Sequence, residues 1–149
     1  EQSAAAAEEL NRQAEGLRMM VMQFKTADQK LAILTVGKED HQRFMDTLHK
    51  VISGKTEASK WPFTDSKHCR FAKWYYSQEG KAYSHVHEYA VIEEPHQRVH
   101  NFGNDAVKAL MAGNRQLAQK LLGQAESASH EVFAALEKFD QALSIAGRV

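Results

Sequence analysis

The sequence predicts an all-α protein: an antiparallel four-helix bundle with a coiled-coil helix at its N-terminus, expected to pair into a homodimer. Three observations favour this class. Only two prolines, Pro62 and Pro95, interrupt the 149 residues. Strand-like alternation of apolar and polar residues is scarce. Apolar residues instead recur every three or four positions along several segments, which is typical of helices that bury one face.

The composition excludes several classes of partner. Nineteen basic residues balance nineteen acidic ones, so no basic surface is expected that would attract nucleic acid or an anionic membrane. Apolar runs such as AILTV and MMVM are far shorter than the roughly 20 residues of a membrane span. No signal peptide is present, and the single cysteine, Cys69, cannot form an internal disulfide; we therefore expect a reducing, cytoplasmic location. Because the chain begins at Glu1 rather than Met, we also expect it to be part of a longer protein.

The first helix is predicted over residues 2–25, where apolar residues recur every seven positions. Leu10, Leu17 and Phe24 form one set, and Ala6 and Met20 form a second set that Gln13 interrupts. This pattern is a short coiled-coil seam, too brief to be stable alone. Because the seam has no predicted partner elsewhere in the chain, we expect it to self-associate.

The second helix is predicted from Asp28 to Ser53, with Gly54 ending it. Its apolar stripe includes His41 and otherwise consists of Leu34, Gly37, Phe44, Met45, Leu48, Val51 and Ile52. A polar connection, residues 54–66, follows. A third helix is predicted to begin near Ser66, a good N-cap residue, and to end at Gly80.

Residues 81–92 are compatible with either a helical turn or an irregular crossover. The next long helix is predicted from Pro95 to Gly113, with Glu93 and Glu94 placed to complement the helix dipole. Asn114 is predicted to cap the last helix, which extends to about Ile145. The apolar stripe of that helix comprises Leu117, Leu121, Ala125, Ala128, Val132, Leu136, Phe139 and Leu143.

The stretch EEPHQRVH places His96 and His100 one helical turn apart on the core-facing stripe. A buried imidazole needs a partner for each nitrogen. Hydrogen bonds alone would hardly satisfy two adjacent buried imidazoles together with His41, which lies on the stripe of another helix. A metal ion would bind all three, so this arrangement favours a metal site.

Cys69 is the expected fourth ligand. If Ser66 caps its helix, Cys69 occupies about the third position, where backbone N–H groups and the dipole favour a thiolate. Three imidazoles and one thiolate match tetrahedral zinc, Zn²⁺. The alternative for each residue alone is a hydrogen-bonded core histidine or a cysteine that packs as a small apolar residue. His68 is expected at the surface or beside the ligands, and the remaining histidines, His49, His85, His87 and His130, are not expected to bind metal.

The same stretch argues against catalysis. Zinc peptidases carry H-E-x-x-H, in which the glutamate activates water, whereas HQRVH has Gln97 at that position. A fourth protein ligand would also leave no open coordination position. No Ser–His–Asp set and no glycine-rich phosphate loop is recognisable. The prediction is therefore a protein without enzymatic activity, and a hydrolase screen would test the metalloenzyme alternative.

Four motifs, DHQRF, CRFAKWYYSQEGKAY, EEPHQRVH and LMAGNRQLA, resemble those of the chemoreceptor zinc-binding (CZB) domain family. The family pattern is a histidine, then a cysteine within C-x-F-G-x-W, then H-x-x-x-H. By motif position the resemblance implies His41, Cys69, His96 and His100 as zinc ligands, the same four residues that their positions on the predicted helices favour. One departure is Ala72, which stands where the family usually has glycine.

Residues 1–27 are similar to the membrane-distal end of a bacterial chemoreceptor signalling coiled coil. The two resemblances imply the C-terminal region of a methyl-accepting chemotaxis receptor, with the zinc-binding bundle in residues 28–149. They imply as partners a second copy of the chain, the receptor signalling domain and, through it, the chemotaxis histidine kinase. The implied function is sensing of zinc or of oxidants such as hypochlorous acid, with Cys69 as the redox-sensing residue. The alternative is a purely structural, zinc-stabilised dimerisation bundle.

Overall fold

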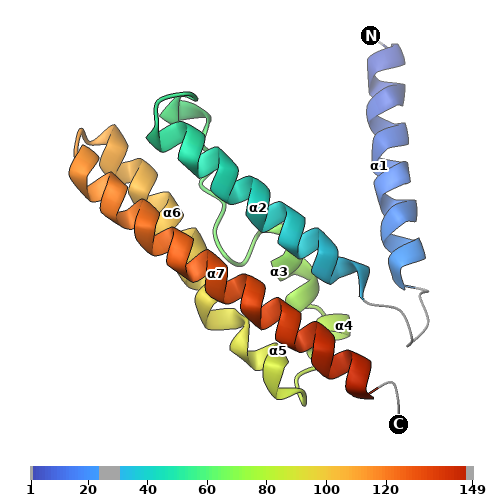
Figure 1. Ribbon diagram of the computed structural model, residues 1–149. Helices are drawn as coiled ribbons and strands as arrows, with labels where there is room; N and C mark the ends of the chain where they lie inside the picture. Colours follow the sequence, from blue (N-terminus) through green and yellow to red (C-terminus); the bar gives the residue numbers. More distant parts are fainter. Residues whose placement is uncertain (1, 24–30, 147–149) are drawn as a thin grey trace.

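The structure, a computed structural model, describes residues 2–23 and 31–146, and within these ranges it contains helices and no strand. The helices are α1 (Gln2–Gln23), α2 (Ala32–Ile52), the 3₁₀ helix η1 (Ala58–Lys60), α3 (Arg70–Tyr75), α4 (Gln78–Lys81), α5 (His87–Val91), α6 (Glu93–Met111) and α7 (Arg115–Ala146) (Figure 1). The predicted all-α class is confirmed. The four-helix arrangement of the bundle and its pairing into a homodimer stay predictions.

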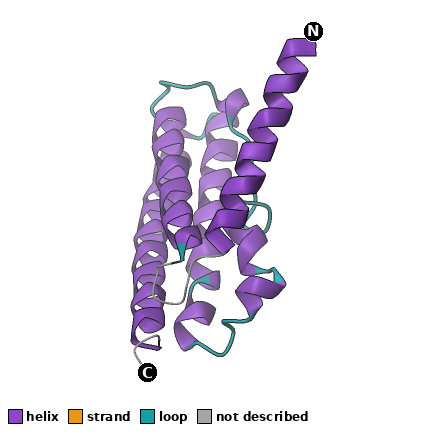
Figure 2. Cartoon of the chain, turned by 90° about the vertical axis from the view of Figure 1, so that its right-hand side faces the viewer, coloured by secondary structure: helices purple, strands orange, loops and turns teal. Residues whose placement is uncertain are grey.

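Three long helices form the body of the domain. α6 packs along α7, and α2 packs against both; Figures 1 and 2 show the three running lengthwise beside one another, with the short helices α3, α4 and α5 at one end. The long and short helices together bury a continuous apolar core. Its largest fully buried side chains are Leu48, Val51, Ile52, Phe71, Ile92, Val99, Val107, Val132, Leu136 and Phe139. The described helices include none that is long and apolar enough to cross a membrane.

The predicted C-terminal ends of α2 and α6 and the predicted N-cap of α7 are confirmed, whereas α2 begins at Ala32 and the predicted start at Asp28 lies outside the described residues. Gly54 and Gly113 follow α2 and α6 with φ of 82° and 80°, the left-handed conformation that commonly ends helices. Asn114 caps α7, since its Oδ1 accepts from the Leu117 N–H at 3.1 Å. Leu117 itself, predicted in the buried stripe, is 41% exposed. At 3.6 residues per turn, residues spaced four apart do not stay on one face of a helix, and Leu117 lies about 80° around the axis from Ala125. Ala118 lies on the buried face instead.

The prediction that Ser66 caps the third helix is wrong. α3 begins at Arg70, and Cys69 is its N-cap. The carboxylate of Asp65 accepts from the backbone N–H groups of Lys67 at 2.8 Å and His68 at 3.1 Å, a side-chain turn that satisfies these donors without a helix. Cys69 therefore lies at the N-cap of α3 rather than at its third position.

The prediction that this helix continues to Gly80 is also wrong. The Ser77 hydroxyl donates to the Trp74 carbonyl at 2.6 Å, at the end of α3, and accepts from the Gly80 N–H at 3.2 Å, which caps α4. Gly80 therefore lies inside α4. The uncertain segment 81–92 contains α5. α6 begins at Glu93, and Pro95 is therefore its third residue rather than its first. Proline fits there because the N–H groups of the first turn have no partner within the helix.

The predicted heptad seam of α1 is described only in part. Leu10 is 65% exposed and Leu17 59% exposed, whereas Phe24 lies outside the described residues. Two leucines seven residues apart therefore present apolar surface on one helix.

Candidate metal centre

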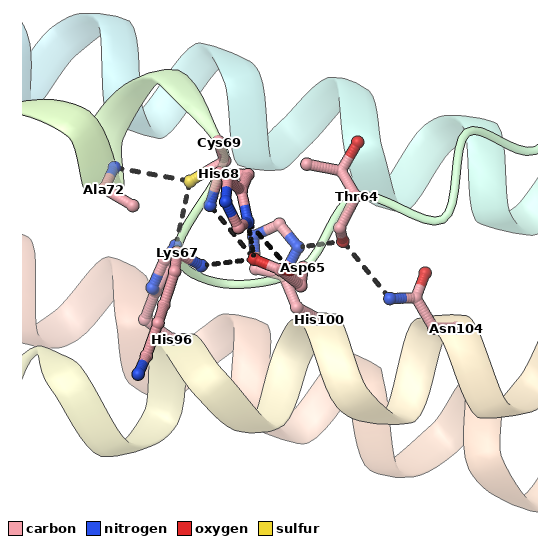
Figure 3. Close-up of polar contacts among 9 residues, drawn as sticks. All are labelled: Thr64, Asp65, Lys67, His68, Cys69, Ala72, His96, His100 and Asn104. Carbon is pink, nitrogen blue, oxygen red and sulfur yellow. Dashed lines mark hydrogen bonds and ion pairs between the residues drawn. The ribbon is translucent and has the colours of Figure 1, made fainter.

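The four predicted ligands come together. His41 lies on α2, Cys69 lies directly before α3, and His96 and His100 lie on α6. One ligand atom from each residue falls within 4.8 Å of the others. The Sγ of Cys69 lies 3.3 Å from the Nε2 of His96, and Figure 3 shows Cys69 facing α6 from the segment above it. Three segments that are distant in sequence thus contribute to one cluster.

The local sequence explains each position. His96 and His100 are one turn apart, so both point into the core, and with His41 they are only 2–3% exposed. The N-cap position directs the sulfur of Cys69 over the start of α3, where it accepts from the Ala72 N–H at 3.4 Å. Ala72, which stands where the resemblance predicts glycine, is fully buried, and its backbone N–H still makes this contact.

The hydrogen bonds fix the tautomers of two histidines. The Nδ1 of His41 donates to the Gly37 carbonyl at 2.6 Å, and the Nδ1 of His100 donates to the Thr64 carbonyl at 2.9 Å. Carbonyl oxygens only accept, so the proton is on Nδ1 and each Nε2 carries a lone pair. Both Nε2 atoms are buried without a hydrogen-bond partner among the described residues. Such atoms cost about 1–3 kcal/mol each when unsatisfied, and a metal ion would satisfy them.

The donor set fits zinc. Ligand atoms around tetrahedral zinc with bonds of 2.0–2.3 Å are about 3.3–3.8 Å apart. The atoms of the cluster already lie within 4.8 Å of one another, so small side-chain movements suffice to bring them to these distances. Three nitrogen donors and one sulfur donor favour zinc over magnesium and calcium, which prefer oxygen ligands.

The charge states of the histidines also suit metal binding. Burial, reinforced by the neighbouring imidazoles, lowers the pKa of His96 to about 2. Burial lowers the pKa of His100 to about 4, and burial likewise lowers the pKa of His41. All three imidazoles are therefore neutral at physiological pH, which is the form that coordinates a metal.

The cysteine behaves differently from the sequence expectation. Burial raises the pKa of the Cys69 thiol and outweighs the N–H donated by Ala72, which lowers it. The helix N-terminus alone therefore does not produce a thiolate. The residue would lose its proton when it coordinates a metal, which is the usual coupling between metal binding and thiol ionisation.

Contacts that the sequence analysis missed hold the ligand-bearing segments together. Arg70 makes a two-pronged ion pair with Asp40, at 2.9 and 2.8 Å, and these residues directly follow Cys69 and precede His41. Arg70 and Asp40 carry opposite charges and each is adjacent in sequence to an expected ligand, so the sequence could have predicted this ion pair. A second set of contacts joins Asn104 to the segment before Cys69, and the sequence carried no signal for it.

A cavity of about 300 Å³ opens onto the cluster. Its lining includes three of the four candidate ligands and consists of Asp40, His41, Phe44, Thr64, His68, Cys69, Arg70 and His100. The cavity gives small solutes a route to Cys69, which is partly exposed.

The other histidines lie outside the cluster. His49 pairs with Glu126, with 2.9 Å between Nε2 and Oε1, and His68 pairs with Asp65 at 2.7 Å. His85 donates from Nδ1 to the Ala82 carbonyl at 2.9 Å. His87 and His130 are exposed.

Three buried histidines and one partly exposed cysteine thus form a candidate metal site in a helical domain. Residues 41–107 match the sequence model of the CZB family, the chemoreceptor zinc-binding domain, and this segment of the chain is a CZB domain. The matched span begins at His41 and contains all four residues of the cluster. No curated protein and no solved structure matches the chain. The protein therefore contains a zinc-binding sensory domain, a class with no known catalytic role, with a cluster of three histidines and one cysteine able to hold zinc.

Proposed function

We propose that this chain is a cytoplasmic regulatory module of a bacterial chemoreceptor, in which His41, Cys69, His96 and His100 hold one zinc ion. Its signal is a change at the zinc site that alters the signalling helices of the receptor and, through them, a histidine kinase. The observation that carries the proposal is the convergence of two buried, unpartnered Nε2 atoms with His96 and Cys69, judged over the described residues, inside a segment that matches the CZB family.

The first test is the zinc content of purified variants. Wild type is expected to contain one zinc per chain, and His100→Ala to bind zinc far more weakly. The loss should exceed the roughly 10–100-fold effect of removing an outer hydrogen-bond partner of a ligand. The matched control is His49→Ala, which removes an exposed histidine paired with Glu126 and should bind zinc as wild type does. Full zinc affinity in His100→Ala would exclude this ligand set.

Cys69 is the proposed receiver of an oxidant signal. It is the sulfur ligand of the set, and the cavity gives small oxidants access to it. With hypochlorous acid, the thiolate sulfur forms a bond to oxygen, chloride leaves with the electron pair of the O–Cl bond, and the product is a sulfenic acid. A sulfenic acid is a poorer metal ligand than a thiolate, so the segment that carries Cys69 would be released while α2 and α6 keep their histidines together.

The second test separates this sensor from the purely structural alternative. Wild type and Cys69→Ser are exposed to a small excess of hypochlorous acid, and sulfenate labelling and helix content by circular dichroism are compared. We expect sulfenate at Cys69 and a loss of helix content in wild type only. Absence of the sulfenate, or the same change in the serine variant, would leave Cys69 as a structural ligand.

The proposed partners are a second copy of the chain and the receptor signalling domain. Residues 1–27 are proposed as the distal signalling coil and residues 28–149 as the zinc-binding bundle. The exposed Leu10 and Leu17 of α1 support self-association, because a seam of this kind buries its leucines against another helix. Light scattering measures the oligomeric state.

A further inference from the structure

We propose that Asn104 is a positioning residue of the metal site. Through the carbonyl of Thr64 it holds His100 in its metal-binding tautomer, and it anchors the segment that leads to Cys69. The inference rests on the proposed ligand set. It begins from the position of Asn104, one turn beyond His100 and two turns beyond His96 on α6, and therefore on the face of the helix that carries both ligands.

The orientation of the Asn104 amide is set by Trp61. The indole Nε1–H of Trp61 donates to the Oδ1 of Asn104 at 2.8 Å. An indole can only donate, so the amide oxygen must face it, and the amide nitrogen is directed to the other side. There the Nδ2 of Asn104 donates to the Thr64 carbonyl at 3.2 Å (Figure 3).

The Thr64 carbonyl is the point where the two side chains meet. Its oxygen accepts from the Nδ1 of His100 at 2.9 Å as well as from Asn104, which uses both of its lone pairs. The first bond keeps the proton of His100 on Nδ1 and leaves Nε2 available for a metal. The second bond fixes the carbonyl in place, so the orientation of the imidazole depends on Asn104.

The backbone at this point needs such an anchor. Phe63, directly before Thr64, has a φ of 50°, in the left-handed region that is strained for a residue other than glycine. Trp61 is 4% exposed and packs on Phe44, which in turn contacts the ring of His100, with centroids 4.9 and 4.8 Å apart. Residues 61–64 are thus held at both ends by Asn104, and the chain continues from there to Cys69.

Asn104→Asp tests the proposal with little change in size. A carboxylate still accepts from Trp61, but it cannot donate to the Thr64 carbonyl and repels that oxygen. The matched control is Asn101→Asp, which makes the same change of charge at an exposed position of α6. Zinc affinity is measured by competition with a chromogenic chelator, and the tautomer of His100 is read from imidazole ¹⁵N shifts of the metal-free protein.

We expect Asn104→Asp to weaken zinc binding about tenfold, at the lower end of the range for outer hydrogen-bond partners. Asn101→Asp should bind as wild type does. In metal-free Asn104→Asp, His100 should show a mixture of tautomers, whereas wild type shows Nδ1–H. Trp61→Phe, which removes the donor that orients Asn104, should weaken binding in the same direction and serves if Asn104→Asp does not fold.

A merely structural role would destabilise the metal-free and zinc-loaded forms equally and leave zinc affinity unchanged. Wild-type affinity and an unchanged His100 tautomer in Asn104→Asp would therefore overturn the inference, while weak binding by His100→Ala in the same experiment would leave the ligand set standing. If wild type bound no zinc, or His100→Ala bound it fully, the proposed ligand set would fail and the role of Asn104 with it.

Discussion

We expect removal of zinc with a strong chelator to lower the melting temperature of the protein. An ion that binds only the native state at a free concentration of 100 times its Kd stabilises it by about 2.7 kcal/mol. In a domain of this size one kcal/mol shifts the melting temperature by about 2–4 °C, so the expected decrease is about 5–10 °C. Thermal unfolding followed by circular dichroism, with and without chelator, measures it.

The physical reason lies in the buried nitrogens. Without the ion, the Nε2 atoms of His41 and His100 have no hydrogen-bond partner in the part of the chain that the structure describes. Returning zinc should restore the original curve. His100→Ala is the control, because a chain without the site should melt at the same temperature with and without chelator. An unchanged wild-type curve, with zinc loss verified by metal analysis, would contradict a stabilising role for the site.

The cluster was predictable where its geometry is local. The histidine pair is one helical turn apart, so its shared face follows from helix geometry alone, and His41 was found because it interrupts the apolar stripe of a long helix. The neighbourhood of Cys69 was less predictable. Asp65 accepts from the His68 N–H, one of the backbone donors that Ser66 was expected to cap. Burial of the Cys69 thiol raises its pKa, and this burial depends on packing that no local pattern reveals.

Contacts between segments that are distant in the chain could not be predicted from the sequence. Asn104 bonds to Trp61, 43 residues away, and to Thr64, 40 residues away, and the path between them includes the left-handed Phe63. The ends of the long helices were predictable for the opposite reason, because Gly54, Gly113 and Asn114 determine them through their own conformation or side chain.

Gly80→Ala is expected to destabilise the protein by about 3 kcal/mol or more, at the upper end of the cost of overpacking. A Cβ at Gly80 would lie 2.2 Å from the carbonyl oxygen of Trp74 and 2.7 Å from that of Tyr75. These are backbone atoms of α3 and cannot rotate away as a side chain could. Relief requires α3 and α4 to separate, which would break the Ser77 hydroxyl bonds that join them.

The damage should reach the metal site through α3. Its last residue, Tyr75, is tied to α5 by a reciprocal pair of bonds: the Tyr75 hydroxyl donates to the Tyr89 carbonyl at 3.0 Å, and the Tyr89 hydroxyl donates to the Tyr75 carbonyl. At the other end of α3, Cys69 is the N-cap. Displacement of α3 therefore moves the sulfur, and we expect zinc affinity to fall together with stability.

Gly123→Ala is the matched control for this substitution. Gly123 lies inside α7, and a Cβ there meets no heavy atom of the described residues within 4 Å. Alanine is a better helix former than glycine by about 0.5–1 kcal/mol, so this variant should be as stable as wild type or more stable. Urea unfolding measures the free energy of unfolding of both variants, and chelator competition measures their zinc affinity. Equal stability of the two variants would show that the turn between α3 and α4 tolerates a side chain, and that Cys69 is not positioned through this close contact.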